Sequence, residues 1–166
     1  LDLGELPGFG DWQGLISGTY SSRYDEDLNL IGVSTSWSVD ELIAPPQRIE
    51  LLAGLALSIR QATNFGATTG SAEFADGVAR IEHLDSTGPD IALNIDSGTA
   101  NISPSYRLTG LDLTVGLVLG QSWVDGNSLQ PLLDAIPLLA TGCEDNTCRF
   151  RFSGNPSRPT VAAALQ

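Results

Sequence analysis

Apolar and polar residues alternate along much of the chain, as they do in a β-strand that has one buried face. Two alternating runs are longer than the others. Their apolar positions are Ile49, Leu51, Ala53, Leu55, Leu57 and Ile59 in the first run, and Leu111, Leu113, Val115, Leu117 and Leu119 in the second. The pattern predicts that strands over 48–62 and 106–119 are the two longest, with these residues largely buried and Val115 on the same face as Leu113 and Leu117.

Shorter alternations predict further strands, and turn-forming residues separate them. The sequence "ADGV" at 75–78 is typical of a type I′ hairpin, whereas "STGPD" at 86–90 and "NPSRP" at 155–159 cannot continue a ladder. Glycines fall singly at turns and within strands, as a strongly curved sheet would use them. We therefore expect a mainly β fold, a curved antiparallel meander that is open or partly closed. Its strands are expected near 12–21, 27–38, 48–62, 69–75, 78–85, 90–97, 106–119, 148–153 and 160–165.

One segment follows the helical period instead. Its apolar residues predict one short helix near 128–140, and they are Leu129, Leu132, Leu133, Ile136 and Leu139. Asn127 or Ser128 is available as the N-cap, and Pro137 is expected to kink or end the helix. Such a helix would cover an opening or an edge of the sheet.

Length and composition favour one domain. A chain of 166 residues with 42% hydrophobic residues can bury its own core. The sequence has no Met, so we expect it to be part of a longer precursor. No apolar run reaches the ~18 to 20 residues that a membrane-spanning helix needs. The formal net charge of −12 would repel phosphate backbones, so we expect no nucleic-acid partner.

The only two cysteines, Cys143 and Cys148, flank four polar residues in "GCEDNTCRF". Such residues favour a tight turn that would bring the two cysteines within bonding distance, so we expect a disulfide. The alternatives are two reduced thiols or a zinc site, for which His83 is the only other soft ligand. A disulfide would imply a periplasmic or secreted protein.

Few residues suggest chemistry. His83, in "ARIEHLD", could belong to a catalytic set with a serine and an acid, but no nucleophile-elbow pattern accompanies it, and an ordinary strand-surface histidine is the simpler interpretation. The sequence contains no Gly-rich phosphate loop, and we expect neither a cofactor nor an enzyme activity.

Two acidic clusters could contact a cation. The first is Asp25, Glu26 and Asp27, and the second is Glu144, Asp145 and Asn146. Both lack the spacing of a calcium loop, so a solvated turn is the simpler interpretation of each. Trp12, Trp37 and Trp123 are expected to pack in the core or at its rim, with a ligand or partner surface as the alternative.

Several segments resemble a known family. The run "TTGSAEFADGVARIEHLDSTGPDIALNIDSGTANISPSYRLTGLDLTVGL" has a small residue, a short strand, "DG", a strand, Gly-Pro, and then strands that end in an apolar ladder. This order resembles that of AsmA-like periplasmic proteins, and most closely the GspN component of bacterial type II secretion systems. The closing "RFRFSGNPSRPTVAAAL" is similar to that family's terminal strand, and "LIGVSTSWSVDELIAP" to an earlier strand with an embedded Trp.

The resemblance implies a periplasmic domain, anchored to the inner membrane through a segment outside 1–166. It would act without catalysis, as an accessory of the secretion machine, through contacts with other secretion-system components. AsmA-like proteins also have a curved sheet whose apolar concave face accommodates lipid chains. This implies an alternative function, a lipid-binding or lipid-transfer groove lined by Ile49, Leu51, Leu55, Leu57, Ile59, Leu111, Leu113, Val115, Leu117 and Leu119.

Overall fold

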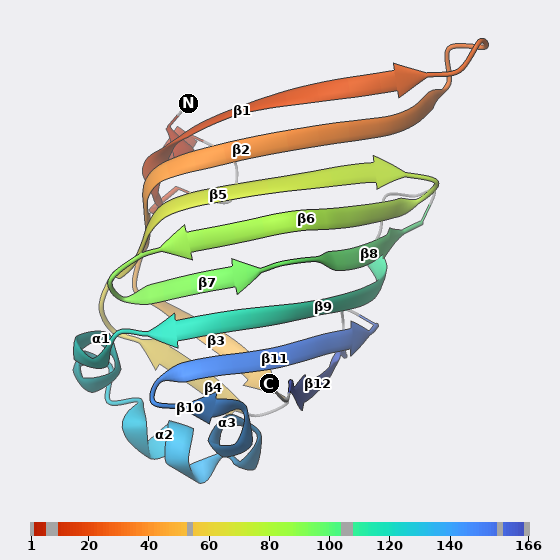
Figure 1. The fold of residues 1–166 in the computed structure, drawn as a ribbon. Coiled ribbons are helices and arrows are strands. Elements are labelled where there is room, and N and C mark those ends of the chain that lie inside the picture. The colour runs from red at the N-terminus through yellow and green to blue at the C-terminus, as the bar shows by residue number, and fades with distance from the viewer. Residues whose placement is uncertain (1, 6–9, 53–54, 104–107, 156–157, 165–166) are drawn as a thin grey trace.

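The computed structural model describes residues 2–5, 10–52, 55–103, 108–155 and 158–164, without the side chains of 49–57. In these residues the protein is mainly β, with a large antiparallel sheet of ten strands, a separate two-stranded hairpin and three short α-helices (Figure 1). The elements are η1 Leu3–Glu5, β1 Gln13–Tyr24, β2 Leu30–Ala44, β3 Gln47–Leu52, β4 Leu55–Ile59, β5 Thr63–Ala75, β6 Val78–Thr87, β7 Ile91–Ile95, β8 Gly98–Ile102, β9 Leu108–Leu119, α1 Gln121–Gly126, α2 Gln130–Ala135, α3 Pro137–Gly142, β10 Cys143–Glu144, β11 Thr147–Gly154 and β12 Thr160–Ala163.

The sheet is the meander that the alternating pattern predicted. Its strands lie in the order β1-β2-β5-β6-β7-β9-β11-β10, and β12 pairs with β11. The chain therefore moves mostly from one strand to its neighbour, as Figure 1 shows from β1 at the top to β11 near the bottom. The β3–β4 hairpin is inserted between β2 and β5, and the helices between β9 and β11. The turn from β5 to β6 has positive φ at both Asp76 (52°) and Gly77 (74°), as a type I′ turn requires.

The sheet is partly ring-closed because β7 and β8 both connect β6 to β9. β7 pairs with residues 84–87 of β6, and β8 pairs with residues 78–81. Both strands also pair with β9, so together they fill one strand position, broken at Asp96 and Ser97. The break lies between the two paired segments of β6, where the register with β5 also shifts. This interruption adds curvature to the sheet.

The expected strand over 48–62 is wrong, because this segment forms the hairpin β3–β4. The pairing shifts register between Glu50 and Leu52, so Ile49 lies opposite Leu57, and Gln47 opposite Ile59. Outside this shift, odd-numbered positions of β3 therefore lie opposite odd-numbered positions of β4, so the apolar positions of both strands keep the same spacing in the sequence. Among the described residues the longest strands are β2, with 15 residues, and β5, with 13, while β9 has 12. Positions 106 and 107 of the predicted strand over 106–119 lie outside the described residues.

The predicted register of β9 is confirmed, but its burial is only partial. Leu113, Val115 and Leu117 share one face, opposite Phe152, Phe150 and Cys148 of β11, and we call this face of the sheet the inner face. The apolar residues of β9 on this face are half-buried rather than fully buried. The reason is that the sheet is a single layer, and the helices gather at only one end of it (Figure 1).

The single helix expected near 128–140 is also wrong in detail. It is two helices, α2 and α3, and α1 precedes them. Pro137 ends α2 as predicted. A residue before proline avoids the α conformation, and Ile136 is accordingly extended (φ −90°, ψ 114°), with Pro137 starting α3. Neither predicted N-cap serves, since α2 begins after Leu129 without a side-chain cap.

Candidate functional site

An apolar cavity of about 210 Å³ lies at the end of the sheet that carries the helices. Its wall combines β3, β4, β5, β7, β9 and β11 with the helical segment. The lining residues are Gln47, Ile59, Thr63, Phe65, Ile91, Leu117, Leu119, Trp123, Leu129, Leu132, Leu133, Ile136, Leu139, Cys148 and Phe150. Because nearly all of these side chains are apolar, the cavity suits an apolar ligand.

Part of the predicted groove lines this cavity. Ile59, Leu117 and Leu119 belong to its wall, whereas Leu111, Leu113 and Val115 share the inner face of β9 but lie farther from the helices. The side chains of Ile49, Leu51, Leu55 and Leu57 fall outside the described residues. The helical residues, which the sequence pattern assigned to a covering role, contribute much of the rest of the wall.

The innermost wall is a small core around α1. Ile59, Trp123, Val124 and Leu129 are buried together, and Ile91, Leu119, Leu132 and Leu133 pack against them. The indole Nε1 of Trp123 donates a hydrogen bond to Thr63 Oγ1 (3.0 Å), so the polar atoms of both buried side chains are paired. Trp123 is thus a core residue, as expected, and it also lines the cavity.

Asn127 fixes this core to the strands. Its side chain is only 3% exposed. Its Oδ1 accepts hydrogen bonds from the backbone N–H groups of Arg60 (2.8 Å) and Gln61 (3.3 Å), and its Nδ2 donates to the Trp123 carbonyl (2.9 Å). One amide therefore joins the end of α1 to the link between β4 and β5. The sequence pattern suggested Asn127 only as an N-cap, because Arg60 and Gln61 lie 67 and 66 positions away and no motif marks its third partner, the Trp123 carbonyl.

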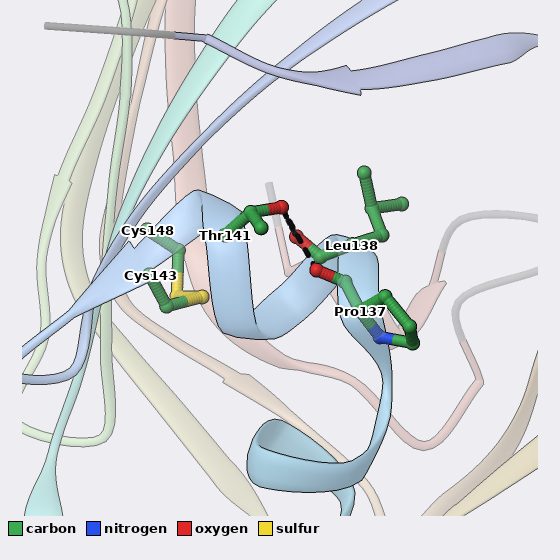
Figure 2. Close-up of a disulfide and its surroundings, with 5 residues drawn as sticks. All are labelled: Pro137, Leu138, Thr141, Cys143 and Cys148. Atoms are coloured by element: carbon green, nitrogen blue, oxygen red, sulfur yellow. Dashed lines mark hydrogen bonds between the residues drawn. A yellow bond between two sulfur atoms is a disulfide. The ribbon is translucent and has the colours of Figure 1, made fainter.

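Helices α2 and α3 form the outer wall. Leu132, Leu133, Ile136 and Leu139 line the cavity but are only half-buried, and neither helix contains a fully buried residue. Thr141 Oγ1 donates to the carbonyls of Pro137 (2.8 Å) and Leu138 (3.2 Å), which closes the single turn of α3 (Figure 2). The outer wall is therefore the part of the cavity that is packed most loosely.

The expected disulfide is present and borders the cavity. Cys143 and Cys148 are paired residues of the β10–β11 hairpin, with Cα atoms 3.9 Å apart (Figure 2). The turn between them has positive φ at Asp145 (46°) and Asn146 (63°), so the cluster 144–146 is a turn, as expected. Cys148 is 2% exposed and lines the cavity beside Phe150. A Cβ on Gly142 would overlap the ring of Phe150, so this position needs glycine.

The other face of the sheet is polar. There Ser71 Oγ contacts His83 Nδ1 (2.9 Å) and Glu82 Oε2 (2.8 Å). The carboxylate accepts from the serine rather than from the histidine, which differs from the order of a catalytic triad. Ser71 itself is buried. The cluster thus connects β5 to β6 across the shift in their register.

The cluster at residues 25–27 forms a turn as well. Asp25 accepts hydrogen bonds from the side chain and backbone of Asn29 and from the backbone of Asp27, and these bonds lower the pKa of its carboxyl group. A second exposed carboxylate, Asp112, binds Arg151 through two hydrogen bonds (3.0 and 2.9 Å), which hold the pKa of Asp112 below its usual range.

The aromatic residues Trp12 and Trp37 are both half-buried. The ring of Trp37 lies against Gly70 of β5, where a Cβ would overlap it. The described residues contain no group of three or more His, Cys, Asp or Glu side chains placed to hold a metal ion. Among the same residues, no helix has both the length and the apolar character needed to cross a bilayer.

Comparison of the chain with protein-family models, with curated proteins and with solved structures finds no match.

Proposed function

We propose that this protein is a non-enzymatic binding domain that takes a linear apolar group, such as the end of an acyl chain, in the cavity beneath α1, α2 and α3. The observation that carries the proposal is the nearly all-apolar wall around about 210 Å³. An apolar cavity of about 150 Å³ in another protein stays dry and binds benzene. A larger cavity with the same kind of wall offers space for a short hydrocarbon segment.

The half-burial of the outer wall supports this assignment. Leu132, Leu133, Ile136 and Leu139 would each gain contacts from a bound chain, and burial of apolar surface contributes roughly 25 cal/mol per Å². The wall has three residues with polar side-chain groups, Gln47, Thr63 and Trp123, and the last two are already hydrogen-bonded to each other. Binding would therefore depend on apolar contact rather than on polar recognition.

The net charge of −12 indicates which probe to use. An anionic fatty acid would be repelled by the protein as a whole, whereas an uncharged primary alcohol of the same length would not. We expect 1-octanol to bind the purified protein with a one-to-one stoichiometry in calorimetry. Mass spectrometry of an organic extract from the purified protein would identify a natural ligand.

A pair of substitutions tests the site. Leu133→Trp places a larger side chain in the cavity wall and should abolish octanol binding. Ala135→Trp, at an exposed position of the same helix, is the matched control and should bind as the native protein does. If octanol does not bind the native protein, or if both variants bind it equally, the cavity is not a ligand site.

The accessory role in type II secretion is a second proposal, supported by the sequence resemblance. The segment that carries the closing motif forms the paired strands β11 and β12. The disulfide supports an oxidising compartment, such as the periplasm. Partners would be other secretion-system components. Normal secretion in a deletion strain, with no secretion component copurifying, would contradict this role.

A further inference from the structure

Strand β1 leaves one long edge of the sheet open. It is the terminal strand, and in the described residues its outer side has a single bridge, between Asp2 and Leu15. From Ser17 to Tyr24 every residue is exposed, and Tyr20 is 78% exposed. On the side toward β2, the hydroxyl groups of Ser17 and Thr19 are hydrogen-bonded to those of Ser38 and Ser36. The edge is therefore held by β2 and, over the part of the chain that the structure describes, has no paired strand along residues 17–24 on its other side.

This edge lacks the features that usually prevent strand addition. Exposed edge strands commonly carry Lys, Pro or a bulge in mid-strand. The segment 17–24, "SGTYSSRY", has no Pro and no Lys, and both register shifts of β1 lie at its ends. Its one charged residue, Arg23, is paired with Glu73 (2.6 Å). A strand of matching polarity could add here without burying an unpaired charge.

The backbone shows which groups would pair. The carbonyl of Thr19 faces β2, where it accepts a hydrogen bond from Thr35 Oγ1 (3.3 Å). Because the N–H and C=O groups of successive residues point to opposite sides of a strand, those of Gly18, Tyr20 and Ser22 point to the open edge. A second strand can bond with these groups if its own alternate residues direct their N–H and C=O groups toward β1.

We propose that a second copy of this chain pairs with this edge, strand β1 against strand β1, antiparallel and centred on Tyr20. In this register Tyr20 lies opposite Tyr20 of the partner, Gly18 opposite Ser22, Thr19 opposite Ser21, and Ser17 opposite Arg23. No like charges oppose each other. Aromatic pairs and hydroxyl pairs are favourable across strands, and the Thr19–Ser21 pair would extend the hydroxyl contact that Thr19 makes with Ser36.

The opposite edge of the sheet favours this symmetric arrangement over a head-to-tail one. There β11 is flanked by β12, of four residues, and β10, of two. Neither is long enough to cover the eight consecutive exposed residues 17–24 of β1, so head-to-tail addition would leave most of that edge unpaired. Two-fold pairing of the same strand covers it and closes the assembly.

Net charge sets the salt dependence of this dimer. Each copy carries a formal charge of −12, so two copies repel each other at a distance, although the paired strands carry only Arg23. Salt screens this repulsion, with a Debye length of about 10 Å at 0.1 M and about 3 Å at 1 M. Dimerisation should therefore strengthen as the salt concentration rises. Binding of a basic partner to this acidic protein would instead weaken as the salt concentration rises, because salt screens attraction as well.

Sedimentation equilibrium tests the proposal. At protein concentrations up to about 100 µM the average mass of the native chain should rise toward twice that of the monomer. Tyr20→Lys puts two like charges opposite each other and should weaken association at least about tenfold. Val118→Lys, at an exposed position of a central strand, is the matched control and should dimerise as the native chain does.

Cysteine capture tests the register. Tyr20→Cys should form an intermolecular disulfide under mild oxidation, because a self-opposed pair has Cα atoms about 5.5 Å apart, within the range of a disulfide. Val118→Cys should not. A native chain that stays monomeric throughout, a dimer that Tyr20→Lys leaves unchanged, or equal capture of both cysteine variants would overturn the proposal.

Discussion

At the scale of single residues, the Asn127 side chain makes the hydrogen bonds that join α1 to the strands beside the cavity. Its side chain satisfies two backbone donors from the β4–β5 link and one carbonyl of α1. Because the Asn127 side chain is only 3% exposed, water does not readily replace the bonds that it makes. This amide therefore helps to hold α1, and with it the inner wall of the cavity, together with the apolar core and the Trp123–Thr63 hydrogen bond.

Replacing Asn127 by Leu should therefore destabilise the protein. The substitution leaves the Arg60 and Gln61 N–H groups without their acceptor. Because both bonds are only part-buried, the cost should lie toward the lower end of the roughly 1 to 3 kcal/mol of an unsatisfied buried donor. Urea unfolding measures the loss. Ser122→Ala, at an exposed position of α1, is the control and should cost less than about 0.5 kcal/mol. Equal effects at the two positions would show that the Asn127 bonds are unimportant.

The Asp112–Arg151 pair leads to a pH prediction at the same scale. The arginine hydrogen bonds lower the pKa of Asp112 in the folded state. A lowered folded pKa contributes stability that is present above the ordinary carboxyl pKa of about 3.9 and is lost as the pH falls through the folded value. Because both side chains are exposed, the contribution is small.

Asp112→Asn should thus lower the urea midpoint slightly at pH 7, and the difference from the native protein should shrink below about pH 4. Arg151→Gln should show the same trend, since it removes the other partner. A difference that persists or grows in acid would mean that the effect has another origin.

Contacts between residues could be predicted from the sequence only where the two partners lie close together along the chain. The turn at Asp76 and Gly77 and the pairing of Cys143 with Cys148 both involve close neighbours, so spacing alone was sufficient. The partners of Asn127 lie 66 and 67 positions away. No periodicity reports a contact of that kind, because it depends on where two elements are packed.

At the scale of elements, alternation predicts that a strand exists but not where the chain reverses. Because of the register shift in the β3–β4 hairpin, odd-numbered positions of β3 lie opposite odd-numbered positions of β4. The apolar residues therefore fall at every second position before and after the reversal, and the sequence looks like one long strand. Likewise, Pro137 marked the end of a helix, but the periodicity of the leucines continues across it. The end of a strand or helix could not be predicted wherever the spacing of the apolar residues continued across it.

The β10–β11 hairpin gives a prediction at this scale. Its disulfide closes a loop of only a few residues, and a loop of ~15 residues would give about 3 kcal/mol in the chain-entropy description. We expect Cys143→Ser with Cys148→Ser to lower stability by roughly 1 to 3 kcal/mol, while the domain stays folded. Thermal unfolding followed by circular dichroism measures this change.

The control for that double variant is its far-ultraviolet spectrum at room temperature. A native-like spectrum is expected, because the ladder of β11 with β9 does not depend on the bridge. Loss of the folded spectrum would show that the disulfide is required by the whole domain rather than by the cavity end alone.

At the scale of the molecule, a one-layer sheet cannot bury its inner face by itself. The helices and the hairpin lie at one end only (Figure 1). The cavity is lined by these elements together with the strands next to them. The meander and its curvature followed from alternation and glycine placement. The cavity did not, because its wall combines residues from β3 to β11 that meet only once the sheet has curved.

The size of the cavity leads to a prediction about chain length. If about 150 Å³ holds the six carbons of benzene, then about 210 Å³ holds about eight carbons in proportion. Each buried methylene contributes about 0.8 kcal/mol, so the affinity for primary alcohols should rise with each carbon up to that length. Beyond it, further carbons remain in solvent and should add little.

Calorimetric titration with alcohols of six to about twelve carbons measures this plateau. A gain that continues unchanged to the longest alcohol would place the ligand along an extended surface of the sheet instead, and a lack of any length dependence would exclude apolar burial as the source of binding.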